Sequence, residues 1–182
     1  MDGMVASVFT EDARQLRAAA EGDAEAFGWL YETHARGMFS LALRLCADRA
    51  LAEDVVQESF VKALAAARSY RGEAPLRAWL KRLTANAAVD RLRAEGRQER
   101  LEAPEPAGLA SADTLHECLG LLERLDGACR TVVWLNLMEG YSHPEIGAMH
   151  GKSESWSKMT MARGLSRLRQ SLEEESDGRA SR

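Results

Sequence analysis

The sequence predicts an all-α fold, and three observations support this prediction. Ala, Leu, Arg and Glu, which favour helices, dominate the 182 residues. Apolar residues recur at helical spacing, and no run of alternating β-branched residues indicates a strand. Proline is scarce inside the periodic stretches, as continuous helices require. We therefore expect an all-α protein built from small helical domains.

The composition also limits the setting in which the chain works. No apolar run approaches the roughly 18 residues of a membrane-spanning helix, and residues 1–16 lack the basic and apolar regions of a secretion signal. We expect a cytoplasmic protein with no membrane insertion of its own. The three cysteines include no CxxC pair, so neither a disulfide framework nor a zinc site is favoured. Reduced, partly buried thiols are expected at Cys46, Cys118 and Cys129.

The charge is unevenly distributed, and its blocks indicate nucleic-acid binding. The whole chain has a net charge of −4. Between Arg68 and Arg100, however, nine Lys or Arg residues stand against four Asp or Glu. Between Lys152 and Arg169, five stand against one. Because basic side chains neutralise phosphates, both blocks are candidate DNA-binding surfaces.

A linker separates the two basic blocks. Over residues 99–112, charged residues, glycine and the prolines Pro104 and Pro106 break the helical period. Such a segment is expected to be a flexible tether without a fixed structure of its own. We therefore predict two small helical domains, over residues 10–98 and 113–174, followed by a frayed tail.

The first domain is expected to begin with a long helix. Asp23 is placed to cap a helix over residues 24–46. The apolar residues of this helix recur on one face, which we expect to be buried. His34 lies on this face and is expected to pack in the core, since no second metal ligand lies beside it. The face comprises Phe27, Leu30, Tyr31, His34, Met38, Leu41 and Leu45.

The next helix, over residues 51–64, separates an apolar side from an acidic side. Asp54, Gln57 and Glu58 cluster with Val61 on the side expected to be exposed. Acids near the start of a helix also suit its dipole. Taken alone, the pattern therefore favours a solvated helix surface over a functional one.

A basic loop and a third helix follow. Gly72 supplies a turn, and Pro75 suits the first position of a helix over residues 76–97. Trp79 and Asn86 lie among the basic residues of this helix. Aromatic and amide side chains can stack on or hydrogen-bond to unpaired bases, while basic residues bind phosphates.

The second domain contains the pattern of a helix-turn-helix motif. Ser142 and Glu145 form a capping box, a short helix ends near Gly151, and a longer basic helix follows. His143 and His150 lack partners at metal-ligand spacing and are taken as non-ligands. The alternative is a basic, solvated helix in a small bundle. The longer helix is expected to turn Met161, Leu165, Leu168 and Leu172 inward and Trp156, Met159, Arg163, Arg167 and Gln170 toward a major groove.

Three stretches together resemble a bacterial RNA polymerase sigma factor of the extracytoplasmic-function (ECF) group. They are "AEDVVQESF", "SYRGEAPLRAWLKRLTANAAVDRLR" and "EGYSHPEIGAMHGKSESWSKMTMARGLSRLR". The resemblance covers nearly the whole chain, and its first part combines a D-x-x-Q-E helix, a basic loop and an N-x-x-x-D-x-x-R helix. It implies sigma region 2 over residues 10–98 and region 4 over residues 113–174, without an intact region 3. It also implies a non-catalytic protein, without cofactor or metal, that binds core polymerase and directs promoter-specific initiation.

The resemblance further implies three binding surfaces and an inhibitor. The expected partners are core RNA polymerase, through its β′ clamp helices and β subunit, promoter DNA, and an anti-sigma factor that covers the polymerase-binding surfaces. The −10 element would be held and melted as an unpaired strand, and the −35 element read as duplex. The implied residues are Asp54, Gln57 and Glu58 for polymerase; Tyr70, Arg71, Trp79, Lys81, Arg82 and Asn86 for the −10 element; and Trp156, Lys158, Met159, Ala162, Arg163 and Arg167 for the −35 element.

Some positions depart from the family pattern. Leu51 stands where an acid is frequent, which makes the polymerase-facing patch poorer. Lys152, Trp156 and Ser157 make region 4 atypical. Because residues 159–162 offer few bidentate hydrogen-bonding side chains, readout of the −35 element is expected to rely on thymine methyl contacts and duplex shape.

Three other interpretations of the sequence remain open. One is a helix-turn-helix regulator that acts without polymerase, which binding to purified core polymerase would exclude. Another is an enzyme, although the sequence has no phosphate-binding loop, metal constellation or nucleophile with a paired base. The third is a degenerate sigma-like protein that serves only as an interaction module.

Overall fold

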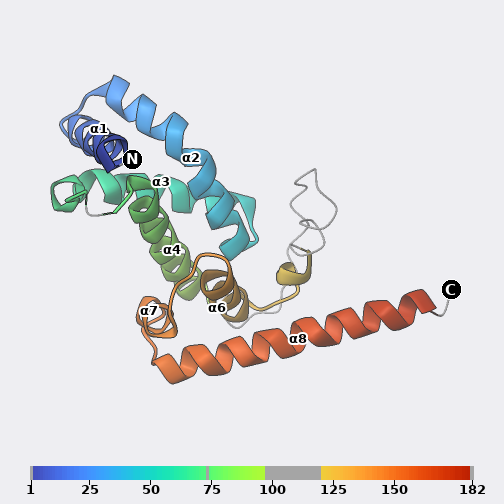
Figure 1. Cartoon of the computed structure of the whole chain (residues 1–182). Helices are drawn as coiled ribbons and strands as arrows, with labels where there is room; N and C mark the ends of the chain where they lie inside the picture. The colour runs from blue at the N-terminus through green and yellow to red at the C-terminus, as the bar shows by residue number, and fades with distance from the viewer. Residues whose placement is uncertain (1, 73, 97–119, 181–182) are drawn as a thin grey trace. The chain divides into compact units, whose positions relative to one another are not determined.

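All regular structure in the described part of the chain is helical, as the sequence predicts (Figure 1). The computed structural model describes residues 2–72, 74–96 and 120–180, with side chains for residues 11–72, 74–96 and 120–173. The predicted linker over residues 99–112 and Cys118 lie outside the described residues. The elements are α1 (Asp2–Ala20), α2 (Ala24–Cys46), α3 (Arg49–Ala65), the 3₁₀ helix η1 (Ala67–Ser69), α4 (Leu76–Ala94), α6 (Gly127–Leu137), α7 (His143–Met149) and α8 (Glu154–Ala180).

The chain divides into two compact units. The first comprises Met1–Leu43 and Ala50–Ala88, and the second comprises Arg44–Arg49 and Val89–Arg182. The ends of α2 and α4 are thus grouped with the second unit. The domain bounds drawn from the sequence stay a prediction.

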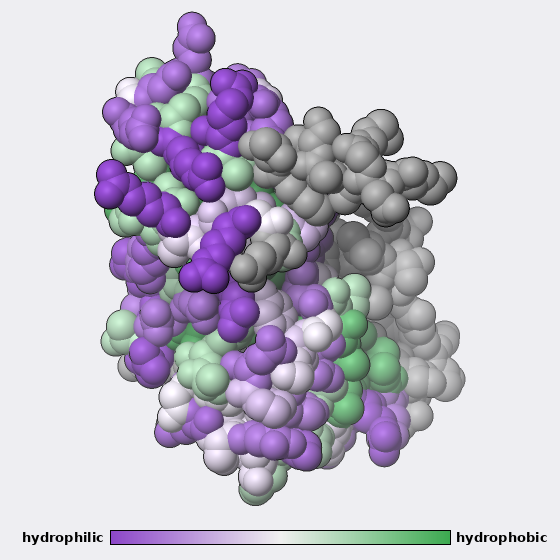
Figure 2. All heavy atoms as spheres, turned by 60° about the vertical axis from the view of Figure 1, so that its left-hand side comes forward, coloured by the Kyte–Doolittle hydropathy of each residue, from purple (hydrophilic) through white to green (hydrophobic). Residues whose placement is uncertain are grey.

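None of the described helices is both long and apolar enough to cross a membrane. Polar side chains cover most of the face in Figure 2, where apolar side chains surface only in small groups.

The first unit is organised by α2, whose start is fixed as the sequence predicts. One carboxylate oxygen of Asp23 accepts hydrogen bonds from the backbone N–H groups of Glu25 (2.9 Å) and Ala26 (3.1 Å). These bonds satisfy donors that the first turn of a helix leaves unpaired. Apolar side chains of α1, α2, α3 and α4 form the core. Its most deeply buried members include Leu16, Leu30, Met38, Leu41, Val55, Leu76 and Leu80.

The predicted inner face of α2 is only partly buried. Phe27 and Tyr31 remain 37% and 50% exposed, whereas Leu30, His34 and Met38 are buried. The two exposed rings contact each other, and both contact Phe60 of α3, with ring centroids 5.4–6.2 Å apart. At this end of α2, the core therefore closes on an aromatic cluster whose outer rings reach solvent.

The second unit contains the predicted helix-turn-helix. The backbone N–H of Ser142 donates to a carboxylate oxygen of Glu145 at 2.9 Å, which confirms the capping box at the start of α7. A Cβ at Gly147 would lie 2.9 Å from the backbone of Ser153, so only glycine fits where the turn folds back on α7. The helix α8 then packs against both α6 and α7.

The predicted inward stripe of α8 is partly wrong. Leu165 and Leu172 are 42% and 51% exposed, and the buried positions are Ser157, Thr160 and Gly164. A Cβ at Gly164 would lie 2.9 Å from a methyl group of Val133 on α6. Because the two helices approach so closely, small residues form the contact and the bulky leucines turn outward.

Candidate protein- and nucleic-acid-binding surfaces

The α3 helix presents the predicted acidic face to solvent. Asp54 and Gln57 are exposed, and Glu58 is half-buried and pairs with Lys62 at 2.8 Å. On the opposite side, Val55 and other apolar residues fill the core. The burial of one side fixes the orientation of the helix, so the acidic side chains cannot rotate inward.

Leu51 does not weaken this acidic face in the way expected from the sequence. It is only 5% exposed and belongs to the buried side of α3. An acid at this position would therefore have to enter the core, at a high desolvation cost. The exposed neighbour of the acidic face is instead Val61, which is 67% exposed.

The loop before α4 is held by Tyr70. The Tyr70 side chain is 4% exposed, and its hydroxyl donates to the backbone carbonyl of Ala74 at 2.7 Å. Its ring centroid lies 5.3 Å from that of Trp79. Burial raises the pKa of the Tyr70 hydroxyl, so it stays protonated as a donor. Tyr70 thus shapes the loop, while Arg71 next to it is exposed.

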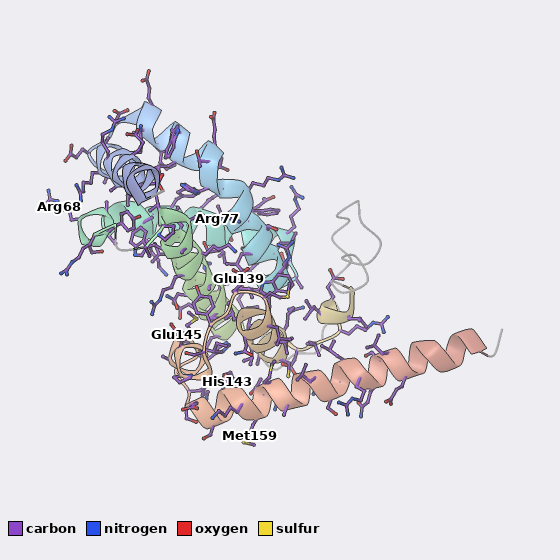
Figure 3. All side chains as sticks on the ribbon, viewed as in Figure 1. Arg68, Arg77, Glu139, His143, Glu145 and Met159 are labelled. Atoms are coloured by element: carbon purple, nitrogen blue, oxygen red, sulfur yellow. The ribbon has the colours of Figure 1, made fainter. Side chains whose placement is uncertain are left out.

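The predicted −10 residues of α4 fall on two faces. At 100° per residue, Trp79, Arg82 and Asn86 share one face, and all three are at least partly exposed. Lys81 lies on another face together with Arg77, one turn before it. Arg77 is marked on α4 in Figure 3. The structure therefore groups three of the predicted residues as one surface and separates Lys81 from it.

The predicted −35 residues at the start of α8 form the most accessible group. Met159 is 74% exposed and projects from the side of α8 opposite α6 (Figure 3), and Ala162 is also exposed. The Lys158 ammonium pairs with Glu154 at 2.6 Å on the surface. Trp156 is half-buried, with its ring 4.8 Å from that of His150.

Two of the predicted −35 residues form contacts with other side chains of the protein. The Nε–H of Arg163 donates to the sulfur of Cys129 at 3.4 Å. Arg167 forms a salt bridge with Asp126, whose side chain is nearly buried. Asp126 also caps α6 by accepting from the backbone N–H of Cys129 at 2.7 Å. These two arginines therefore join α8 to α6, a role that the sequence pattern does not predict.

The comparisons with known proteins decide the family. Residues 30–98 match the family model for Sigma-70 region 2. The chain is 31% identical over 162 residues to the RNA polymerase sigma factor CarQ of Myxococcus xanthus, an alignment covering 85% of this chain and 93% of that protein. It is 32% identical over 161 residues to the ECF RNA polymerase sigma factor SigM of Mycobacterium tuberculosis, covering 86% and 82%. The chain belongs to the ECF sigma factors of the sigma-70 family.

Solved structures agree with this assignment. The ECF sigma factor is similar to CnrH in its complex with the cytosolic domain of CnrY, with 27% identity, a TM-score of 0.53 and coverage of 90% and 97%. It is also similar to RpoE in its complex with the anti-sigma factor NepR from Bartonella quintana, with 25% identity, a TM-score of 0.55 and coverage of 82% and 98%.

The expected function is confirmed at the level of the family. As an ECF sigma factor, the chain binds core RNA polymerase and directs promoter-specific transcription initiation. Its family consists of transcription factors rather than catalysts. A helix-turn-helix regulator that acts without polymerase is set aside, because the relatives align over more than four-fifths of the chain.

Two histidines give the sigma factor a polar core in its second unit. The Nδ1 atom of His143 lies 3.0 Å from the hydroxyl of Ser157, and Nε2 of His150 lies 3.2 Å from the hydroxyl of Thr131. The atypical Ser157 is therefore buried with a hydrogen-bonding partner. Thr131 donates to backbone carbonyls of its own helix, so His150 acts as the donor to it. Burial lowers the pKa of His150 to about 4, so the ring is neutral.

The described cysteines of the sigma factor are structural. Cys46 and Cys129 are free and buried, as the sequence predicts. Burial raises the pKa of the Cys129 thiol, which keeps it protonated and unreactive at neutral pH. No cluster of three or more His, Cys, Asp or Glu side chains arranged for a metal ion occurs among the described residues.

Proposed function

We propose that the acidic face of α3 is the surface by which this sigma factor docks on core polymerase. Asp54, Gln57 and Glu58 lie within residues 30–98, which match Sigma-70 region 2. Asp54 and Gln57 are exposed and Glu58 is half-buried beside them, with an apolar core directly behind, and this is the observation that carries the proposal. An exposed acidic face suits the basic β′ clamp helices that the resemblance implies as its partner.

The face of α4 that contains Trp79, Arg82 and Asn86 is proposed to hold the unpaired strand of the −10 element. A half-buried tryptophan offers a stacking surface, the arginine binds phosphate, and the amide hydrogen-bonds to base edges. Arg71 would add a phosphate contact from the loop. Tyr70 would act indirectly, by holding the loop against Trp79. Lys81 would contact the −10 strand from a separate face of the helix.

The start of α8 is proposed to read the −35 element as duplex. Lys158 would bind phosphate, and Met159 and Ala162 would contact thymine methyl groups in the major groove. Trp156 would support this surface through its contact with His150. Arg163 and Arg167 would bind phosphates through those guanidinium N–H groups that do not contact Cys129 or Asp126.

The remaining assignments follow from these surfaces. We assign region 2 to residues 10–98, the linker to residues 99–112 and region 4 to residues 113–174. The chain is proposed to have no enzymatic activity, to need no cofactor or metal, and to work in the cytoplasm with the polymerase. RpoE was solved with the anti-sigma factor NepR, and CnrH with the cytosolic domain of CnrY. An anti-sigma factor is therefore proposed to cover the polymerase-binding surfaces here.

A titration of core polymerase with the fluorescently labelled sigma factor tests the docking proposal. Asp54→Arg/Glu58→Arg is expected to weaken binding by at least about ten-fold, because it places positive charge against a positive partner. Glu21→Arg/Glu25→Arg, which makes the same charge change at exposed positions outside α3, is the matched control. Equal affinities of the two variants would contradict the proposal.

A further inference from the structure

Asp126 connects the start of α6 to the helix α8 within the second unit. Its side chain is 7% exposed. One carboxylate oxygen, Oδ1, accepts a hydrogen bond from the backbone N–H of Cys129 at 2.7 Å, and the other, Oδ2, forms the salt bridge with Arg167. Because both oxygens are engaged, the carboxylate cannot rotate freely. The backbone of α6 therefore determines where the Arg167 guanidinium is held.

Small residues make the rest of the contact between α8 and α6, which pack against each other (Figure 1). The buried residues of α8 here are Thr160 and Gly164. The thiol of Cys129 donates a weak bond to the backbone carbonyl of Thr160 at 3.7 Å. A surface of small residues lets two helices come close, but it has few ridges that could fix the rotation of one helix about its own axis. The long side chains that cross this contact are therefore the ones that can fix it.

The rotation of α8 determines which of its side chains meet the bases. At 100° per residue, Arg167 lies about 20° from Thr160, on the side toward α6, whereas Met159 and Ala162 lie about 100° and 160° from Thr160. A rotation of only about 20° moves atoms at the helix surface by about 2 Å. Such a shift is larger than the tolerance of hydrogen bonds and close apolar contacts. Base readout by α8 therefore requires a fixed rotation.

We propose that Asp126 is a positioning residue for −35 recognition, which fixes the rotation of α8 through Arg167 and so directs Met159 and Ala162 toward the bases. The proposal rests on the proposed function, because it requires that the start of α8 reads the −35 element. Arg167 can contact two partners at once. Its side chain is 36% exposed, and its salt bridge with Asp126 is made through Nη1. A guanidinium carries five N–H donors, so others can bind a phosphate.

The test uses holoenzyme assembled from core polymerase and the full chain. Two probes are compared: a promoter fragment recovered by the wild-type holoenzyme from a genomic library, and the same fragment with the base pairs of its −35 segment replaced. The ratio of the two dissociation constants measures −35 discrimination. A general effect of charge on DNA affinity is the same for both fragments and cancels in this ratio.

Asp126→Asn removes the charge of the carboxylate and keeps the helix cap, because Asn and Asp are equally favourable at this position. It is expected to lower the discrimination ratio by about five-fold, as is Arg167→Gln. The double variant should discriminate as Arg167→Gln does, within about two-fold, because both substitutions break the same salt bridge. Glu173→Gln, which removes a negative charge at an exposed position of α8, is the matched control and should leave the ratio within about two-fold of the wild type.

A purely structural role of Asp126 would change stability without changing the ratio. Urea unfolding therefore checks that each variant is folded under the assay conditions. If Asp126→Asn is not folded, Arg167→Gln, which leaves the cap intact, is compared with Glu173→Gln in its place. An unchanged ratio in the folded variant, or a double variant well below Arg167→Gln, would overturn the proposal and leave the proposed function intact. A wild-type ratio near one would instead overturn the assignment of α8 to the −35 element, and with it the role of Asp126.

Discussion

The buried histidine His150 makes the stability of the second unit depend on pH. Its side chain is 1% exposed and donates to the hydroxyl of Thr131. Protonation would place a charge in the core next to Trp156, whose ring lies 4.8 Å away. The unit therefore needs His150 to be neutral, and the tryptophan gives a spectroscopic signal of its state.

The free energy of unfolding should fall as the pH falls from about 6.5 toward 4. The pKa of His150 is about 4 in the folded chain, against 6.5 for the free side chain. In this window the unfolded chain binds more protons than the folded one, so acid favours unfolding. At pH 5 the loss from this residue is about 2 kcal/mol relative to pH 7.5.

Urea unfolding at pH 7.5 and pH 5, followed by tryptophan fluorescence, measures this loss. In His150→Gln, whose amide can still donate to Thr131, the part of the pH dependence due to His150 should disappear. An equal fall of stability in the variant and the wild type would show that another group is responsible.

The burial or exposure of a residue was predictable where the helical period alone determines it. The exposure of Asp54 and Gln57 and the burial of Val56 follow from their spacing on one helix. The bonds between Arg167 and Asp126 and between His143 and Ser157 were not predictable. Their partners are 41 and 14 residues apart in the sequence, so only the folded chain brings them together.

At the scale of elements, the starts of α2 and α7 were predicted best. The observed bounds of α2 are those expected from the sequence, and the Ser142 capping box starts α7 as predicted. The helices α1 and α6 were missed. In α6, nine consecutive residues from Gly127 to Leu135 are buried, so the helix has no polar side to produce an amphipathic period. In α8, the apolar period suggested the wrong inner face because small residues make the contact.

The close packing of α8 on α6 predicts opposite effects of the same substitution at two glycines. Gly164→Ala should destabilise the protein by about 1–3 kcal/mol, because its Cβ would lie 2.9 Å from Val133. Gly28→Ala, at a helical position with no atom within 4 Å of the added Cβ, should stabilise it by up to about 1 kcal/mol. Thermal unfolding of both variants measures the effects. A neutral Gly164→Ala would contradict the close contact.

At the scale of the whole molecule, we propose that acidic and basic side chains bind different partners. The acidic side chains of α3 face one way on their helix, while the basic residues concentrate on α4 and α8. A net charge of −4 conceals this division. Family membership and the helical fold were predictable because motif order and spacing extend over the whole chain.

This division predicts that DNA melting and polymerase docking can be impaired separately. Arg82→Gln should reduce promoter opening several-fold through loss of a phosphate contact on the unpaired strand, while affinity for core polymerase stays unchanged. Permanganate reactivity of unpaired thymines in polymerase–promoter complexes measures opening, with Arg17→Gln as the control. Equal opening by the two variants would remove Arg82 from the DNA-binding face.

In vitro transcription tests the central claim most directly, that the α3 face docks on polymerase while α4 and α8 bind the promoter. Sigma-free core polymerase is combined with a library of short genomic promoter fragments and with the wild type, Asp54→Arg/Glu58→Arg or Glu21→Arg/Glu25→Arg. Discrete transcripts with the wild type and the control, and none with the α3 variant, are the predicted result. Undiminished transcription by the α3 variant would contradict the claim.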